Sequence, residues 1–266
     1  MAEQMRLDAA LVMRGLISGR DRAKEMISNG VVLVNGKTVK KASHICLPED
    51  EIALLQAPEF VSRGGEKLEK ALAVFPIETE GVCALDIGAS TGGFTQCLLR
   101  HGAAEVYAVD VGHGQLADVL RQDNRVHNLE GVNIRNLRPE QLEHKPTLAV
   151  CDASFISIRL IFPVLKQLLA PGAQCVFLVK PQFEAGRQNV GKKGVVKDPA
   201  VHRMVLKEVL ASVRENSFIP IGLTHSPIRG PEGNLEFLLW FADCGNEPML
   251  DVSEIVRLAH QEKETI

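Results

Sequence analysis

Residues 86–94 read "DIGASTGGF", and this stretch decides how the longer part of the chain folds. It follows the apolar run "VCAL" and precedes the helical pattern "TQCLLRHG". A strand, a glycine-rich turn and a helix form the unit on which α/β enzymes build cofactor and nucleophile sites. Three interpretations are open: a dinucleotide loop, a serine nucleophile elbow, and the loop that holds the amino-acid end of S-adenosylmethionine.

The first two interpretations each lack a required part. Ser90 stands where a dinucleotide fingerprint needs its second glycine, so a side chain obstructs the approach of a pyrophosphate. Residues 88–92 match the G-x-S-x-G elbow letter for letter, and Asp152 with His202 or His225 could complete a triad. However, nothing upstream of the loop resembles an oxyanion loop. The elbow therefore stays a minor alternative.

S-adenosylmethionine carries no phosphate, and its ribose is held by an acid at the end of the next strand. Asp110 ends the run "EVYAVDVG", at roughly the spacing expected of an acid that accepts hydrogen bonds from ribose hydroxyls. Asp86 ends the first strand and is placed to orient the loop or the amino end of the cofactor. Both carboxylates together favour the third interpretation.

The rest of this part of the chain predicts an α/β fold. Apolar runs at residues 82–87, 105–111, 125–129, 148–153 and 174–180 alternate with helical segments, which is typical of a parallel sheet covered on both faces. Residues 219–228 and 234–241 read as strands separated by "RGPEG", which predicts an antiparallel pair at the sheet edge. The fold class is therefore a Rossmann-like sheet, mostly parallel, of the methyltransferase type.

The first 56 residues have a different organisation. Helical spacing at residues 7–16 and 20–30 is followed by a hairpin at 31–39, turning at Asn35-Gly36, and a short strand at 51–55. We therefore expect a small α+β domain at 1–56, a linker at 57–63 and the α/β domain at 64–266, where a helix at 65–75 leads into the sheet.

Composition restricts the classes of function. The chain has 266 residues, of which 45% are hydrophobic and 24% charged, with a net charge of −3. Residues 1–44 nevertheless hold eight Lys or Arg against four Asp or Glu, so this end can face a polyanion. The six cysteines form no C-x-x-C pair, and no metal is expected. Without an export signal or an apolar run of about 20 residues, the chain is expected to be cytoplasmic.

Charged residues at strand ends suggest where an acceptor would bind. Asp152 and Lys180 end neighbouring apolar runs, Glu236 lies in "GPEGNLEF", and Lys67 lies in the helix that leads into the sheet. A second cation and burial both favour a neutral lysine, so Lys67 near Lys180 would make Lys180 a general base towards a hydroxyl. The segment "CDASF" lacks the Pro pair typical of enzymes that methylate base amines.

Long motifs carry a resemblance over nearly the whole chain. "RDRAKEMISNGVVLVNGK" resembles the RNA-binding fold of the fourth small-subunit ribosomal protein, and "VSRGGEKLEKAL", "LDIGASTGGFT", "VYAVDVGHGQL", "LVKPQFEAGR" and "GVVKDP" resemble the TlyA family, often labelled hemolysin-like. The resemblance implies an FtsJ-like methyltransferase domain that uses S-adenosylmethionine on ribose 2′-hydroxyls of cytidine in ribosomal RNA. It also implies a catalytic tetrad, which maps onto Lys67, Asp152, Lys180 and Glu236.

The resemblance and the loop together define a cofactor set: Asp86, Gly88, Ala89, Ser90, Thr91, Gly92, Asp110 and Val111. The basic side chains expected to contact ribosomal RNA or ribosomal subunits are Arg6, Arg14, Arg20, Arg22, Lys24, Lys37, Lys40, Lys41, Arg63, Arg187, Lys192 and Lys193. Two other classes of protein stay open: a membrane-active hemolysin, which the absence of a long apolar or amphipathic stretch disfavours, and an RNA-binding protein with an inactive methyltransferase domain.

Overall fold

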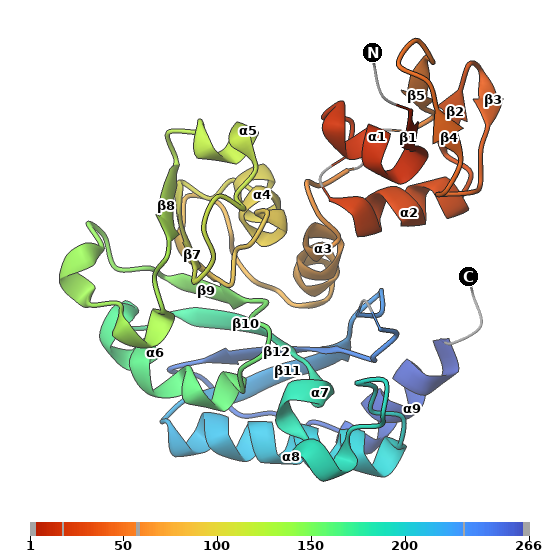
Figure 1. The fold of residues 1–266 in the computed structure, drawn as a ribbon. Coiled ribbons are helices and arrows are strands. Elements are labelled where there is room, and N and C mark those ends of the chain that lie inside the picture. Colours follow the sequence, from red (N-terminus) through yellow and green to blue (C-terminus); the bar gives the residue numbers. More distant parts are fainter. Residues whose placement is uncertain (1–3, 18, 57–58, 231, 263–266) are drawn as a thin grey trace. The chain divides into compact units, whose positions relative to one another are not determined.

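The computed structural model describes residues 4–17, 19–56, 59–230 and 232–262. The chain divides into two compact units, residues 1–63 and residues 64–266, which we call the N-terminal and C-terminal units (Figure 1). No helix among the described residues is long and apolar enough to cross a membrane.

The N-terminal unit packs two helices, α1 (Leu7–Met13) and α2 (Arg20–Ser28), with two small sheets. One sheet has the order β3-β2-β5 and consists of Lys37–Thr38, Val32–Val34 and Ile52–Leu54; the other pairs β1 (Met5–Arg6) with β4 (Ile45–Cys46). The predicted hairpin turn is present, because Asn35 and Gly36 both have positive φ, as a type I′ turn requires. The first helix is shorter than predicted, and β1 and β4 were not predicted.

The C-terminal unit is built on a seven-stranded sheet with the order β11-β12-β10-β9-β6-β7-β8. The strands are β6 (Cys83–Ile87), β7 (Glu105–Asp110), β8 (Val126–Glu130), β9 (Leu148–Cys151), β10 (Gln174–Val179), β11 (Ile219–His225) and β12 (Phe237–Ala242). Every pair from β10 through β8 is parallel, while β12 runs antiparallel to both β10 and β11. This confirms the predicted parallel sheet with an antiparallel edge, in which β12 is the reversed strand.

Helices cover both faces of this sheet (Figure 1). They are α3 (Gly64–Val74), α4 (Gly93–Arg100), α5 (Asp118–Arg121), α6 (Phe162–Leu168), α7 (Pro181–Glu184), α8 (Pro199–Glu215) and α9 (Val252–Gln261), with single 3-10 turns at Ile134–Asn136, Pro139–Gln141, Ile158–Leu160 and Arg187–Asn189. Residues of α6, α8 and α9 belong to one buried cluster with strand residues, while α4 contacts α3, β6 and β7.

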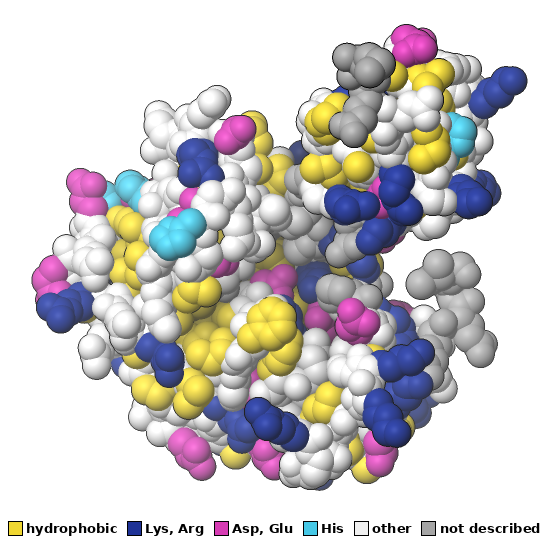
Figure 2. Space-filling view, in the orientation of Figure 1, with side chains coloured by type: hydrophobic (Ala, Val, Ile, Leu, Met, Phe, Trp, Pro, Cys, Tyr) yellow, Lys and Arg dark blue, Asp and Glu magenta, His cyan; other side chains and the backbone are white. Residues whose placement is uncertain are grey.

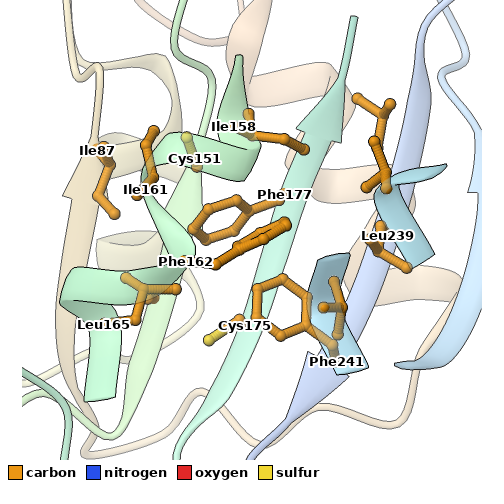
Figure 3. Close-up of a cluster of buried hydrophobic side chains, with 14 of the residues drawn as sticks. Ile87, Cys151, Ile158, Ile161, Phe162, Leu165, Cys175, Phe177, Leu239 and Phe241 are labelled. Carbon is orange, nitrogen blue, oxygen red and sulfur yellow. The ribbon is translucent and has the colours of Figure 1, made fainter. Parts of the chain in front are cut away.

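Aromatic side chains fill the centre of the large core (Figure 3). The ring of Phe162 from α6 lies 5.7 Å from that of Phe177 in β10 and 5.4 Å from that of Phe241 in β12. All three side chains are completely buried. Burying an aromatic side chain of this kind contributes roughly 1.5–3 kcal/mol. This core holds β9, β10 and β12 in register, and therefore fixes the positions of the residues at their ends.

The sheet has a topological switch point between β6 and β9. The chain moves from β6 to β7 and β8 on one side, then returns to place β9 on the other side of β6. Helical crossovers on opposite sides of such a point leave a crevice at the carboxyl ends of the strands, where α/β proteins bind their ligands.

Candidate active site

The glycine-rich loop after β6 makes a sharp bend into α4. Gly88 and Gly92 have φ of +81° and +95°, and Ser90 also has a positive φ of +48°. The amide of Gly88 donates to the carbonyl of Val109 at 2.8 Å, which ties the loop to β7. A Cβ on Gly88 would lie 3.0 Å from backbone atoms of Ala153, a tight contact, and its φ of +81° also favours glycine between the loop and the chain beyond β9.

The carboxylate of Asp110, at the end of β7, is fixed by two backbone donors. Ser90 N–H donates to Oδ2 at 2.8 Å and Gly112 N–H donates to Oδ1 at 2.7 Å. Each carboxylate oxygen can accept a further hydrogen bond. Asp110 is therefore a pre-oriented acceptor for a pair of hydroxyls.

A cavity of about 620 Å³ lies at the carboxyl ends of β6, β7 and β9. Its polar wall includes Gly88, Ser90, Asp110 and Asp152; Val111, Ile134, Ile156 and Ile161 are among its apolar lining residues. Apolar walls with a few convergent polar groups are typical of a cofactor site. An adenosyl group fits this donor set, since its ring requires apolar walls and its ribose requires an acceptor such as Asp110.

The predicted cofactor residues divide into two groups. Gly88, Ser90, Asp110 and Val111 line the cavity, whereas Asp86, Ala89, Thr91 and Gly92 do not. These four support the bend from beneath: the Thr91 carbonyl, for example, accepts from Ala117 N–H at 3.2 Å. Three further residues line the cavity and were not predicted, although they follow the strand ends by only a few residues: Gly112, Gln115 and Asn133.

Asp86 is completely buried beneath the loop. Its Oδ2 accepts a hydrogen bond of 2.6 Å from the Thr95 hydroxyl of α4. Burial raises the pKa of Asp86 to about 7, although the Thr95 hydroxyl lowers it. Of the two roles expected for Asp86, this contact matches the one that orients the loop.

The serine elbow interpretation receives no support. The Ser90 hydroxyl donates to Gln115 Oε1 at 3.1 Å. The two candidate bases make their contacts elsewhere, because His202 is hydrogen-bonded to His260 at 2.9 Å and His225 lies 3.3 Å from Glu262. No histidine in the described part of the chain forms a hydrogen bond with Ser90.

The four predicted catalytic residues meet in one connected cluster beside the cavity. Lys67 Nζ lies 2.7 Å from Glu236 Oε2 and 3.7 Å from Asp152 Oδ2. Lys180 Nζ lies 2.6 Å from Asp152 Oδ1. Lys67, Lys180 and Glu236 are buried, at 7%, 7% and 2% exposure. The charges alternate, so each ammonium faces a carboxylate, which offsets the cost of burying them.

Their positions follow from the topology. Asp152 and Lys180 stand one residue beyond β9 and β10, Glu236 immediately precedes the reversed strand β12, and Lys67 lies on α3. Reversing β12 places its beginning at the carboxyl ends of the parallel strands. Residues 169 apart in sequence, Lys67 and Glu236, thereby become hydrogen-bonded.

Ser154 and Phe155, which follow Asp152 in the chain, extend this site and were not predicted. The ammonium of Lys180 donates to Ser154 Oγ at 2.7 Å and to the Asp152 carbonyl at 3.1 Å. Phe155 is 91% exposed, lines the cavity, and has a positive φ of +64°, which is rare for a bulky side chain. The ring of Phe155 lies 5.2 Å from that of Phe183.

The basic residues expected to bind RNA fall into three kinds. Arg6 and Arg20 share the buried carboxylate of Asp8, and the hydrogen bond from Arg6 lowers the pKa of Asp8 to about 2. Arg14 donates to three backbone carbonyls, and Arg22 and Arg63 contact Glu25. The remaining members, Lys24, Lys37, Lys40, Lys41, Arg187, Lys192 and Lys193, have exposed side chains.

Comparisons with known proteins place the chain in a family. The FtsJ-like methyltransferase model matches residues 60–243, and the S4 domain model matches residues 5–52. The 16S/23S rRNA (cytidine-2′-O)-methyltransferase TlyA of Mycobacterium tuberculosis is 43% identical over 242 residues, which cover 90% of each chain. Hemolysin A of Brachyspira hyodysenteriae is also 43% identical, over 89% of this chain and 99% of its own.

A solved structure supports the same placement. The structure of a hemolysin-named protein from Streptococcus thermophilus superposes with a TM-score of 0.80 at 42% identity, covering 98% of both chains. The matching family models span most of both units. The chain belongs to the TlyA family of FtsJ-like methyltransferases, with an S4 domain in its N-terminal unit.

Proposed function

We propose that this protein transfers a methyl group from S-adenosylmethionine to the ribose 2′-hydroxyl of cytidine in ribosomal RNA, in the cytoplasm. The observation that carries the proposal is the buried cluster of Lys67, Asp152, Lys180 and Glu236, which adjoins a cavity containing the fixed carboxylate of Asp110. The relative from M. tuberculosis is named for this reaction.

The cavity residues would hold the cofactor. Asp110 would accept from its ribose hydroxyls, and Val111 and Ile134, which line the cavity, would face the adenine ring. When bound, S-adenosylmethionine supplies an electrophilic methyl group on a sulfonium. Asp110→Ala removes a charged acceptor and is expected to weaken cofactor binding, as measured by calorimetry. Unchanged affinity would remove Asp110 from the cofactor site without affecting the fold.

Lys180 acts on the acceptor. Its Nζ lies at the cavity wall formed by Asp152 and Ser154, so it can reach a ribose hydroxyl that enters there. In the transfer, the bond from the methyl carbon to the sulfonium sulfur would break as the 2′-oxygen bonds to that carbon, so that S-adenosylhomocysteine leaves. The hydroxyl proton would pass to Nζ of Lys180, acting in its amine form as the general base. Asp152, paired on its other oxygen with Lys67, holds the amine in place, and Glu236 holds Lys67.

Phe155 provides a platform for the target base. An exposed aromatic ring on strained backbone, supported by the ring of Phe183, is unusual away from a ligand site. Stacking on such a ring contributes about 1–3 kcal/mol per base. Phe155→Ala is therefore expected to raise KM for RNA roughly tenfold, whereas Phe155→Tyr retains activity. Equal activity of all three proteins would remove this role.

The N-terminal unit docks ribosomal RNA. Its exposed lysines Lys37, Lys40 and Lys41, together with the guanidinium groups of Arg6 and Arg20, present positive charge to phosphates. Ion pairing with Asp8 fixes the direction of both arginines, which favours docking of an ordered RNA backbone over loose attraction.

Transfer of labelled methyl groups to ribosomal RNA, followed by mapping of the modified nucleotide, tests the reaction. The substrate is ribosomal RNA from cells that lack the protein. After incubation with the protein, this RNA is expected to carry a 2′-O-methylcytidine that is absent from the untreated RNA. Methyl groups on a base would contradict the proposal. Labelled cofactor that binds without transfer to any ribosomal RNA or subunit would favour an inactive RNA-binding protein instead.

A further inference from the structure

A second cavity, of about 660 Å³, lies on the C-terminal unit and shares no lining residue with the cofactor cavity. One wall is the segment between α7 and α8, the other is the segment that leads into β12, and His260 of α9 also lines it. Both segments extend from the carboxyl edge of the sheet, where Lys180 and Glu236 stand.

The walls of this cavity are strongly basic. Lys192, Lys193, Lys197 and Arg229 line it, and Glu232 is the one carboxylate among its described lining residues. Figure 2 shows Lys and Arg side chains gathered near the segment between α7 and α8. Within the described part of the chain, no carboxylate pairs with Lys192, Lys193 or Lys197. Three such ammonium groups around one hollow repel each other unless an anion lies between them.

Asn234 holds the two walls of the cavity together. This residue is 2% exposed, its Nδ2 donates to the Gly194 carbonyl at 2.9 Å, and its Oδ1 accepts from Val196 N–H at 3.0 Å. Its carbonyl also accepts from Gly230 N–H at 3.0 Å. One buried amide therefore joins the two walls, so the lysines of one are held opposite Arg229 of the other.

The same wall lies directly against the catalytic cluster. A Cβ added to Gly230 would lie 2.6 Å from Glu236 Oε1, so the backbone beside Arg229 packs on the carboxylate that holds Lys67. The basic cavity and the cluster therefore share the short segment from Arg229 to Glu236. A ligand in the cavity is placed next to the site of transfer.

We infer that this cavity binds a backbone phosphate of the RNA strand whose ribose is methylated, an inference that rests on the proposed function. The chemistry favours a phosphate over a nucleobase, because four cationic side chains line the cavity and no Phe, Tyr or Trp is among the described lining residues. A phosphodiester held here fixes the strand beside Lys180 independently of docking by the N-terminal unit.

The first test compares variants of the full chain that lose positive charge inside and outside the cavity, and it includes Lys192→Gln and Lys193→Gln singly so that each can be compared with the control at equal charge. The double variant Lys192→Gln/Lys193→Gln is expected to bind a synthetic cytidine-containing RNA hairpin about tenfold more weakly, with a salt dependence reduced by about one phosphate contact. Lys145→Gln is the control, because exposed Lys145 precedes the amino end of β9, at the opposite edge of the sheet. Equal effects of Lys145→Gln and the double variant would overturn the inference.

The second test identifies the phosphate. Single linkages of the hairpin are replaced in turn by neutral methylphosphonates. One linkage is expected to weaken binding to the wild-type chain and to have no effect on the double variant, because the contact is already lost. If no linkage shows such coupling, the cavity does not hold an RNA phosphate. Saturation of the cavity by inorganic phosphate at the concentration where RNA binds would identify a free anion and also overturn the inference.

Both tests measure binding, so they remain informative if the proposed reaction fails. A wild-type chain that transfers no methyl group but shows the coupled linkage would contradict the proposed function and support the phosphate site. A chain that methylates cytidine without any coupled linkage would do the reverse.

Discussion

At the scale of single residues, Asp152 determines what the catalytic cluster can do. Its two carboxylate oxygens face the ammonium groups of Lys180 and Lys67, at 2.6 and 3.7 Å. Lys180 therefore stands between a carboxylate and the place where an acceptor would enter, and two roles are open to it, a general base and a positioning charge.

Substitution of Lys180 separates these roles. Lys180→Ala is expected to reduce methyl transfer by about 10²–10⁴-fold, the contribution typical of a general base, without loss of cofactor affinity. Lys180→Arg is expected to be nearly as inactive, because arginine keeps the charge but cannot give up its proton. Single-turnover transfer to ribosomal RNA measures both. Near-wild-type transfer by Lys180→Arg would assign Lys180 a positioning role only.

Asp86 predicts a pH dependence of stability. Its pKa is about 7 in the folded state, against about 3.9 in an unfolded chain. Between these values the folded state holds a proton that the unfolded state has released, so the free energy of unfolding falls as the pH rises from about 4 to 7. Asp86→Asn keeps an acceptor for Thr95 but cannot ionise.

The free energy of unfolding of the Asp86→Asn variant should therefore not fall between about pH 4 and 7. At pH 8 this free energy should exceed that of the wild type by up to about 4 kcal/mol. Urea unfolding of both proteins at several pH values measures the difference. Stability curves that stay parallel across this pH range would show that Asp86 ionises normally in the fold.

At the scale of elements, the strands and their charged ends could be predicted because burial on both faces requires continuous apolar runs. Asp152 and Lys180 lie one residue beyond β9 and β10, close to where the apolar runs end. The pairing of Lys67 with Glu236 could not be derived from those runs, since it depends on where β12 inserts in the sheet. For this pair, the family resemblance identified the residues, and the antiparallel orientation of β12 explains why they meet.

Other features had no signal in the sequence. Strands β1 and β4 contain two residues each, too few to show a period of alternation. The positive φ of Phe155 reverses the usual preference of a bulky residue, so only tertiary structure can impose it. Ser154 and Asn234 are ordinary polar residues until their hydrogen-bond partners, distant in sequence, are known.

The glycine-rich loop yields a prediction about its contact with the chain after β9. Gly88→Ala should lower stability by about 1–3 kcal/mol through its φ of +81° and also weaken cofactor binding, because the added Cβ would lie 3.0 Å from the Ala153 backbone. Gly172→Ala is the matched control, with φ of +80° and no atom within 4 Å of the added Cβ.

Calorimetric titration of the cofactor into both variants tests this prediction. Cofactor affinity is expected to fall for Gly88→Ala and to stay at the wild-type value for Gly172→Ala, although both variants carry the same backbone strain. A loss of the same size in both variants would mean that strain alone, and not the contact with Ala153, governs the loop.

At the scale of the whole molecule, the two units have separate cores. Residues of α1, α2 and the small strands form one buried cluster, and residues of the seven-stranded sheet and its helices form another, without a shared member. A unit with its own core can in principle fold alone. The two expected tasks, docking RNA and transferring the methyl group, therefore fall on parts that can be separated experimentally.

A chain that begins at Val61 tests this division. It retains the whole sheet, the cofactor cavity and the four clustered residues, so cofactor affinity is expected to match that of the full chain. RNA affinity should fall by at least about tenfold and lose much of its salt dependence, because the lysines and arginines of the N-terminal unit are gone. Methylation of ribosomal RNA by the shortened chain at the full-length rate would refute the docking role, since the phosphate cavity would then suffice to position the strand.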